Sequence, residues 1–126
     1  KLCRRLQKKY PKGVQALSYT KKMPLYLKAC DVILTKPGGL TSTEAAVSEI
    51  PIVHIEAIPG CETKNVRYFT KRGMSISAEE QVDLGAACDR LLGAAGEQMR
   101  ARQRKYSNKH AAADICDLME SVLKKE

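Results

Sequence analysis

The sequence predicts an α/β fold in which a parallel sheet is covered by helices on both faces. Two continuous apolar runs rich in β-branched residues, at 31–36 and 50–58, are bounded by breaking residues and suit buried strands. Amphipathic segments alternate with these runs, as at 115–122, where apolar residues recur at helical spacing. Short strands that alternate with helices form βαβ units, and such units build a parallel sheet.

The individual elements follow from local patterns and from the Pro and Gly residues that interrupt them. "PKG" ends a first helix, and "PGG" separates a strand from the helix that follows it. In chain order, we expect a helix at 1–10, a strand at 14–19, helical turns at 23–30, a strand at 31–36, a helix from Thr41 to Glu49, a strand at 50–58, a loop at 59–65 with a short helix to Lys71, a strand at 73–77, a helix at 79–92 and a final helix around 115–122.

Length and composition place the chain among single globular domains. It has 126 residues, of which 44% are apolar and 29% charged. The chain starts with Lys inside an expected helix, so we interpret 1–126 as one partial domain whose first strands are absent. No signal peptide or membrane-spanning run is present in the sequence. Five cysteines without C-x-x-C spacing indicate free thiols in a reducing compartment.

The net charge of +8 suits an anionic partner, which could be nucleic acid, an acidic membrane surface or a charged substrate. A solvated surface without a partner is the alternative. One Phe, no Trp and no basic stripe interleaved with aromatic residues argue against nucleic acid. The basic stretch 97–110 is interpreted as a solvated helix face, with contact to a membrane surface as the other possibility.

The segment "LTKPGGLTSTEAA" (34–46) carries the clearest chemical pattern. It follows a predicted strand, and ligands of open parallel sheets bind beyond the carboxyl ends of strands. Gly38 and Gly39 would permit positive φ and let a ligand approach the backbone closely. The next helix, expected from Thr41, would present unpaired N–H groups to an anion. Neither the Walker A nor the G-x-G-x-x-G spacing is present.

The same residues have a purely structural interpretation. "TSTE" fits a capping box, in which Thr41 would cap the new helix and Glu44 would accept from the N–H of Thr41. Local physics leaves open whether Glu44 caps the helix or binds a ligand.

Residues 31–76, "DVILTKPGGLTSTEAAVSEIPIVHIEAIPGCETKNVRYFTKRGMSI", resemble the donor half of GT-B glycosyltransferases of family 28. The likeness extends over 14–77 and is greatest to diacylglycerol glucosyltransferases and monogalactosyldiacylglycerol synthases. Their pattern runs D-x-x-[IL]-T-K-P-G-G-[LI]-T-x-x-E-A and then P-G-Q-E-x-x-N. The resemblance implies the C-terminal half of a GT-B fold, a Rossmann-like domain, truncated at its N-terminus.

The resemblance also implies roles for single residues. Lys36 belongs to the pattern without an assigned contact, and Cys61 stands where the pattern has Gln. A thiol forms weaker hydrogen bonds than an amide. The usual contact with the hexose is therefore uncertain at Cys61, and the identity of the hexose stays open. The implied positions are Gly38, Gly39, Leu40 and Thr41 for the UDP diphosphate, Glu44 for the ribose, Tyr19 and Thr20 for the uracil lining, and Cys61, Glu62 and Asn65 for the sugar-facing loop.

The activity that the resemblance implies is transfer of a hexose, glucose or galactose, from a UDP-hexose to a diacylglycerol-type lipid acceptor with inversion. It implies no cofactor and no metal. The general base is expected in an N-terminal acceptor domain, so this piece alone is not expected to be active. His54 and His110 are interpreted as structural or surface residues. The enzyme would be cytoplasmic and peripheral on the inner face of an anionic membrane, without a nucleic-acid partner.

Three alternatives remain at this stage. The chain could be a separate nucleotide-sugar-binding subunit that docks on an acceptor-domain chain. It could belong to an N-acetylglucosaminyltransferase of the peptidoglycan type. It could also be a structural or nucleic-acid-binding domain that uses only its charge.

Overall fold

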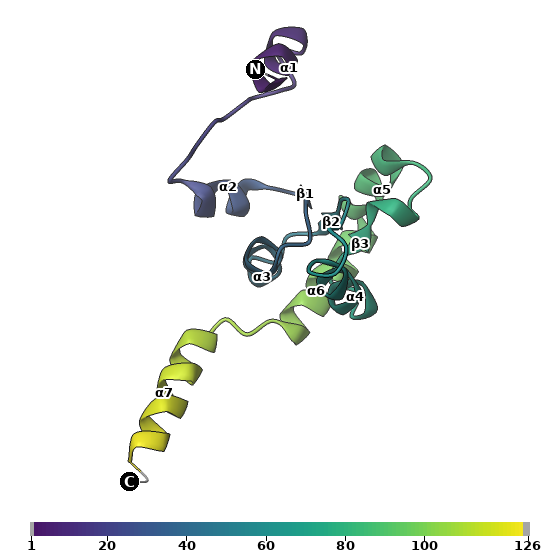
Figure 1. The fold of residues 1–126 in the computed structure, drawn as a ribbon. Helices are drawn as coiled ribbons and strands as arrows, with labels where there is room; N and C mark the ends of the chain where they lie inside the picture. Colours follow the sequence, from purple (N-terminus) through teal and green to yellow (C-terminus); the bar gives the residue numbers. More distant parts are fainter. Residues whose placement is uncertain (1, 125–126) are drawn as a thin grey trace.

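The computed structural model describes residues 2–124, and its centre is a three-stranded parallel sheet (Figure 1). The strands are β1 (Ile33–Thr35), β2 (Ile52–His54) and β3 (Ile76–Ser77), in the order β1-β2-β3. Ile33 lies opposite Ile52, and Val53 lies opposite Ile76. The predicted α/β fold with a parallel sheet is therefore confirmed, although each strand is shorter than its apolar run.

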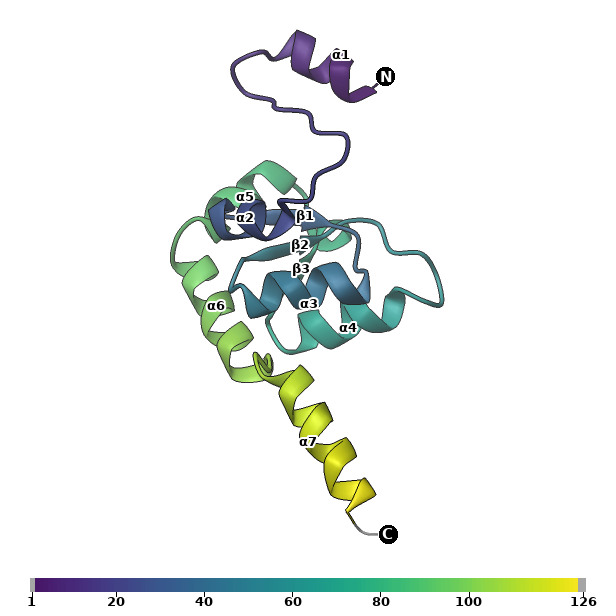
Figure 2. The ribbon, with the colours of Figure 1, turned by 90° about the vertical axis from the view of Figure 1, so that its left-hand side faces the viewer.

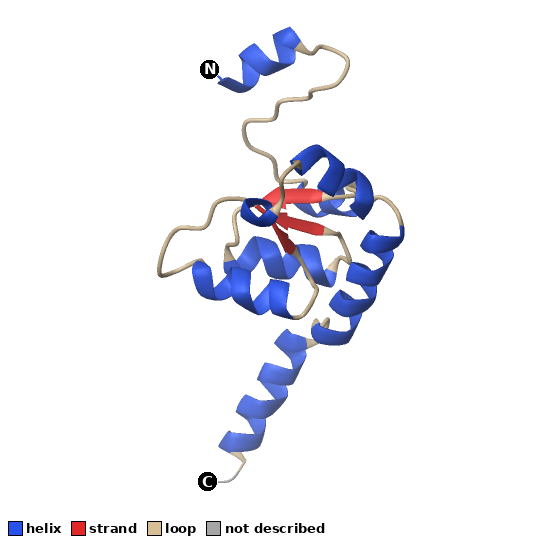
Figure 3. Ribbon diagram, turned by 90° about the vertical axis from the view of Figure 1, so that its right-hand side faces the viewer, coloured by secondary structure: helices blue, strands red, loops and turns tan. Residues whose placement is uncertain are grey.

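Helices flank this sheet on both faces, as Figures 2 and 3 show from opposite sides. One face carries α3 and α4, whereas α5 and α6 pack on the other. The helices are α1 (Leu2–Lys9), α2 (Met23–Ala29), α3 (Gly39–Val47), α4 (Thr63–Lys71), α5 (Leu84–Leu91), α6 (Ala94–Tyr106) and α7 (Ala111–Leu123), with a 3-10 turn η1 (Ala78–Glu80) after β3.

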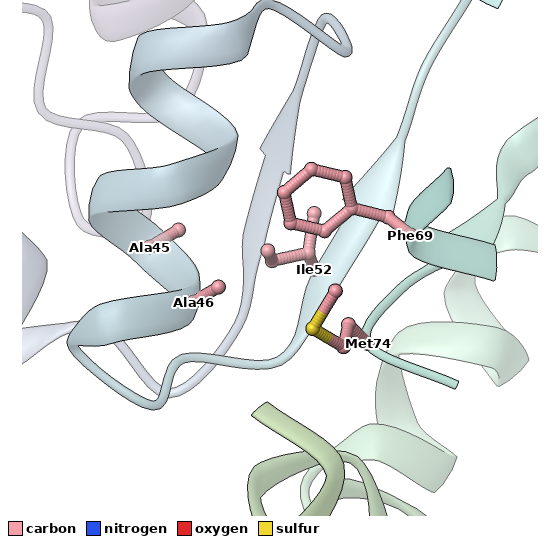
Figure 4. Close-up of a cluster of buried hydrophobic side chains, with 5 residues drawn as sticks. All are labelled: Ala45, Ala46, Ile52, Phe69 and Met74. Carbon is pink, nitrogen blue, oxygen red and sulfur yellow. The ribbon is translucent and has the colours of Figure 1, made fainter. Parts of the chain in front are cut away.

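The core on the first face holds α3 close to the sheet. Ala45 and Ala46 face β2, and their small side chains let the helix approach Ile52 (Figure 4). Phe69 from α4 and Met74 complete this buried cluster. Burial of a large apolar side chain contributes about 2 kcal/mol, so this cluster fixes α3 after the carboxyl end of β1.

The core on the second face brings α5 and α6 together over β2. Val53, Leu91 and Met99 are buried against one another. Gly96 allows the close approach of the two helices, because a Cβ at this position would lie 1.9 Å from the carbonyl oxygen of Leu91. No other residue type fits at Gly96 without a shift of the backbone.

The stretch 97–110 is only partly the solvated face that we expected. Within α6, Met99 and Gln103 are buried. Gln103 Nε2 donates to the carbonyl oxygens of Ile50 at 2.7 Å and Met74 at 3.0 Å. The amide thus joins the segments that lead into β2 and β3, and this face of α6 belongs to the core.

The strand predicted at 14–19 is wrong. In the structure this segment is an extended connection between α1 and α2, and it lies away from the sheet (Figures 1 and 2). A strand requires a neighbouring strand that accepts hydrogen bonds from its N–H groups and donates to its carbonyl oxygens. Within residues 2–124, no such neighbour lies beside 14–19, so its alternating pattern remains without a partner.

Two helix predictions are correct in type and inaccurate in detail. The helix expected at 79–92 starts only at Leu84, because Asp83 caps it by accepting from the N–H of Ala86 at 3.1 Å. Val82 precedes this cap and is fully exposed.

The final helix α7 forms as predicted, but its apolar stripe is exposed in the structure. That stripe consists of Ile115, Leu118, Met119 and Val122.

Candidate functional site

Two loops meet at the carboxyl edge of the sheet. Because the strands are parallel, Thr35 and His54 both end their strands at this edge. The loop at 36–38 leads into α3, and the loop at 55–62 leads into α4. Asn65 Nδ2 donates to the carbonyl oxygen of Pro37 at 2.8 Å. This hydrogen bond ties the Pro-Gly-Gly turn to the loop that the sequence analysis assigned to the sugar.

The amino-terminal end of α3 presents unpaired backbone donors. Its first intrahelical bond runs from the N–H of Ser42 to the carbonyl oxygen of Gly38, at 3.1 Å. No side chain caps the helix. In residues 2–124, the N–H groups of Gly39, Leu40 and Thr41 have no acceptor. Three free donors at the positive end of a helix dipole favour an anion.

The capping box suggested by "TSTE" is wrong. Gly38 is the N-cap residue, with φ −70° and ψ 141°, so the helix starts at Gly39 rather than at Thr41. Thr41 is therefore the third residue of the helix, and Glu44 lies a turn further along. Glycine is an acceptable N-cap, which lets the helix begin two residues earlier. With the capping role removed, the exposed Glu44 carboxylate has no hydrogen-bonding function in the described chain.

The two glycines are not required by the fold itself. The expectation of positive φ is wrong, because Gly38 has φ −70° and Gly39 is the first residue of a right-handed helix. A Cβ placed on either glycine meets no atom within 4 Å. Neither backbone conformation nor packing among residues 2–124 thus demands glycine here. What the glycine pair provides is unobstructed access to the backbone N–H groups.

Glu44 lines a shallow cavity between α2 and α3. The cavity has a volume of about 240 Å³ and also includes Met23 and Lys28. Thr20 lies just before α2, where its Oγ1 accepts from the N–H of Lys22 at 3.0 Å. Tyr19 is 81% exposed and does not line this cavity. The structure therefore places Glu44 beside the helix that follows Tyr19 and Thr20, without a direct contact to Tyr19.

The loop after β2 is closed by one of its predicted site residues. Glu62 Oε2 accepts from the N–H of Ile58 at 2.7 Å. Gly60, with φ +90°, forms the turn between them, a conformation that glycine adopts most easily. Cys61 is exposed on this loop. Glu62 thus shapes the loop from which Cys61 projects.

His54 is a buried structural residue, as the sequence analysis expected. Its Nε2 lies 3.0 Å from Ser42 Oγ, and its Nδ1 lies 3.0 Å from Ser75 Oγ. The ring also meets Phe69 edge-on. Burial lowers the pKa of His54 from 6.5 to about 4, so the ring is neutral at neutral pH. It links α3 to Ser75, the residue before β3.

The two serines that hold His54 were not predicted from the sequence. A histidine inside an apolar strand must find hydrogen-bonding partners, and this requirement is a general signal for nearby hydroxyl groups. The sequence does not say which hydroxyls these are, because the two serines lie 12 and 21 residues from the histidine.

Other classes of site are not apparent in the described residues. No three His, Cys, Asp or Glu side chains of residues 2–124 are grouped as metal ligands. None of the helices there is both long and apolar enough to cross a membrane. All five cysteines are free, and Cys88 is the one that is partly buried.

Comparison with known proteins relates the chain to enzymes of glycolipid synthesis. It is 29% identical over 104 residues to the processive diacylglycerol beta-glucosyltransferase of Bacillus cereus strain AH187, covering 82% of this chain. It is 31% identical over 113 residues to the protein of that name from Staphylococcus saprophyticus, covering 85% of this chain. For the Bacillus licheniformis protein, the identity is 26% over 123 residues and 93% of this chain.

These matches cover only part of each relative. The chain spans 26%, 29% and 32% of the length of the three proteins. No family model matches the chain. The matched region includes the Pro-Gly-Gly turn and the loop joined to it by Asn65. The chain is therefore homologous to the C-terminal part of the processive diacylglycerol beta-glucosyltransferases.

Proposed function

We propose that this chain is the donor-binding part of a UDP-sugar-dependent hexosyltransferase that acts on a diacylglycerol-type lipid. The observation that carries the proposal is the pair of glycines, where a Cβ would meet no atom within 4 Å, at the start of a helix with three unpaired N–H groups. The relatives' names specify a glucosyltransferase, which favours glucose over galactose as the hexose. The acceptor and its general base would come from an N-terminal acceptor domain, and transfer would proceed with inversion.

The geometry suits stabilisation of a leaving diphosphate. As the bond between sugar and UDP breaks, negative charge builds up on the diphosphate oxygens. The N–H groups of Gly39, Leu40 and Thr41, with the Thr41 hydroxyl, would donate hydrogen bonds to those oxygens. Donors that are already oriented stabilise such charge without reorganisation, and the helix dipole adds to the effect. We propose that these groups supply the positive potential at the leaving group without a metal ion.

The ribose, the uracil and the hexose would contact different residues along the carboxyl edge of the sheet. Glu44 would accept from the ribose hydroxyls, since an ionised carboxylate is an acceptor only and suits a diol. Tyr19 and Thr20 would line the uracil on the α2 side. The loop with the exposed Cys61 and the half-buried Glu62 would face the hexose, together with Asn65 from the start of α4.

The ribose role can be tested on the intact protein by calorimetric titration with UDP and UDP-glucose. We expect Glu44→Ala to weaken UDP binding about tenfold or more, because hydrogen bonds to a charged group are lost. The melting temperature should stay constant, since the Glu44 side chain makes no hydrogen bond in the described chain. Glu120→Ala on the distant α7 is the matched control. Unchanged UDP affinity in Glu44→Ala would refute the ribose role of Glu44. If the wild-type protein does not bind UDP, the proposed donor-binding function is refuted.

We further propose that the anionic surface partner binds the segment 2–28. Residues 1–30 contain nine Lys and Arg residues but no Asp or Glu, although the whole chain has 22 basic and 14 acidic residues. The net positive charge therefore lies entirely in this segment. Its cations are exposed on α1, α2 and the connection between them, and Leu2 and Leu6 are exposed beside them. Basic residues next to apolar ones favour an anionic lipid surface.

The basic stretch 97–110 fits such a surface less well. Arg104 and Lys109 both pair with Glu49, and Arg100 pairs with Glu97. Three of its cations are thus already engaged within the chain.

Sedimentation with phosphatidylglycerol and phosphatidylcholine vesicles distinguishes the two segments. We expect Lys8→Glu with Lys9→Glu to weaken binding of the intact protein to phosphatidylglycerol about tenfold or more. Arg102→Glu with Lys105→Glu, a change of equal charge, should have a smaller effect. The reverse order would assign the contact to 97–110. Equal binding to vesicles of the two lipids would exclude a preference for an anionic lipid surface.

A further inference from the structure

We infer that Asn65 is a positioning residue for the diphosphate site, in addition to any contact with the sugar. Its side chain fixes the peptide unit that precedes the unpaired N–H groups of α3. The inference rests on the proposed function, because it assigns Asn65 a part in the binding of UDP itself.

The peptide unit between Pro37 and Gly38 is held at both ends. Its carbonyl oxygen accepts from Asn65 Nδ2 at 2.8 Å. Its N–H group, on Gly38, donates to the carbonyl oxygen of Lys36 at 2.8 Å. Pro37 is itself fully buried, and its ring fixes φ. This plane therefore cannot rotate without the loss of a hydrogen bond.

The next peptide unit is restrained through α3, because the carbonyl oxygen of Gly38 accepts from the N–H of Ser42 at 3.1 Å. Gly38 and Gly39 lack side chains, and no atom lies within 4 Å of the positions where a Cβ would stand. Glycine has the widest choice of backbone conformations, so the joint between the turn and α3 relies on these hydrogen bonds for its conformation. Asn65 stands at the third position of α4 and reaches the turn from a rigid helix. It thereby orients the joint from which the N–H groups of Gly39 and Leu40 follow.

Orientation of these donors matters because binding energy is lost when donors must first be ordered. Donors held in place before the ligand arrives stabilise charge more effectively than flexible ones. The hydrogen bond also occupies one of the two N–H donors of the Asn65 amide. A sugar hydroxyl could use the second donor or Oδ1, which has no partner in residues 2–124.

Affinity for UDP without a sugar distinguishes the two roles. We expect Asn65→Leu, which is similar in size and uncharged, to weaken binding of UDP and of UDP-glucose to the intact protein by the same factor, about tenfold. Amide hydrogen exchange at Gly38, whose N–H is bonded to Lys36, should accelerate in the unliganded variant, while the melting temperature changes little. Asn108→Leu, in the connection between α6 and α7, is the control and should leave both affinities unchanged.

Each other outcome has a definite meaning. Unchanged UDP affinity with weaker UDP-glucose binding would overturn the inference and leave Asn65 as a sugar contact alone. Unchanged binding of both ligands would also overturn it, while the proposed function would stand on wild-type binding. A wild type that binds neither ligand would overturn the proposed function, and the inference with it.

Discussion

The two ends of helix α3 differ sharply in how their backbone groups are satisfied. At its carboxyl-terminal end, the N–H of Glu49 donates to Ala46 and the N–H of Ile50 donates to Ala45, which closes the helix in a Schellman motif. The Glu49 carboxylate accepts from Arg104 at 2.7 Å and from Lys109 at 2.8 Å. At the other end, three N–H groups have neither a cap nor a packed neighbour.

This difference separates what the fold needs from what a ligand would need. Every α-helix leaves its first N–H groups without an internal partner. At α3 these groups are exposed and have no side-chain cap, so they are free to donate to a ligand. The glycines give the same contrast. Gly96 is required by packing between α5 and α6, whereas Gly39 is required by nothing in residues 2–124. The closed end serves the fold, and the open end suits an anion.

The largest effect on stability should come from Gly96→Ala. Its Cβ would overlap the carbonyl oxygen of Leu91, so α5 and α6 must move apart. We expect the free energy of unfolding to fall by roughly 3 kcal/mol or more. Denaturant titration followed by circular dichroism measures this loss. A change below about 1 kcal/mol would mean that the two helices are not tightly packed, and the contrast with Gly39 would disappear.

A comparable loss of folding stability is expected when the pH falls. The folded pKa of His54, about 4, lies below the ordinary value of 6.5. The unfolded chain therefore binds a proton more readily, and stability declines as the pH falls from 6.5 to about 4. The full difference corresponds to about 3 kcal/mol. Denaturant midpoints measured across this range should show the decline.

The variant His54→Gln supplies the control for this pH dependence. It removes the titrating group, so its stability should vary less over the same range even if it starts lower. His110→Gln, at an exposed position, should retain the wild-type slope. A wild-type slope in His54→Gln would assign the decline to other groups.

A smaller loss of folding stability is expected when Glu49, whose φ is +60°, is substituted or protonated. Hydrogen bonds from Lys109 and then Arg104 lower the pKa of this carboxyl below its ordinary 4.5. Its contribution to stability is thus present above pH 4.5 and is lost as the pH falls through the folded pKa. Glu49→Gln should cost about 0.5–1 kcal/mol, because such pairs are partly exposed.

Glu49→Gly probes the backbone at the same position. Glycine removes the ion pairs but also relieves the positive φ, which is worth about 1 kcal/mol. Denaturant titrations at low and high salt should therefore find this variant more stable than Glu49→Gln. The opposite ranking would show that relief of the positive φ is worth less than the extra conformational entropy that glycine loses on folding.

The sequence predicted the parts of the fold that depend on local patterns. The apolar runs before Pro37 and after Ile50 became strands because β-branched residues suit a buried parallel sheet. Gly96, Met99 and Gln103 follow the i, i+3, i+7 spacing of a buried helix face, a signal that basic neighbours obscured. The strand at 14–19 was wrong because pairing depends on a neighbour that local sequence does not specify.

The candidate site was predictable in position but not in detail. The Pro-Gly-Gly break located the turn, yet four hydroxyl and acidic residues suggested a cap where the structure uses Gly38. The hydrogen bond from Asn65 to Pro37 joins residues 28 apart, and no local pattern encodes it. Roles of single residues in ligand binding came from the resemblance and remain predictions.

The central claim is that Gly39 is kept open for a ligand, and Gly39→Ala tests it most directly. A Cβ there meets no protein atom, and alanine favours a helix by up to about 1 kcal/mol. We predict an unchanged or slightly higher melting temperature of the intact protein, with UDP affinity reduced about tenfold or more in calorimetric titration. Unchanged UDP affinity in this variant would contradict the account, because the open space would then have no part in binding.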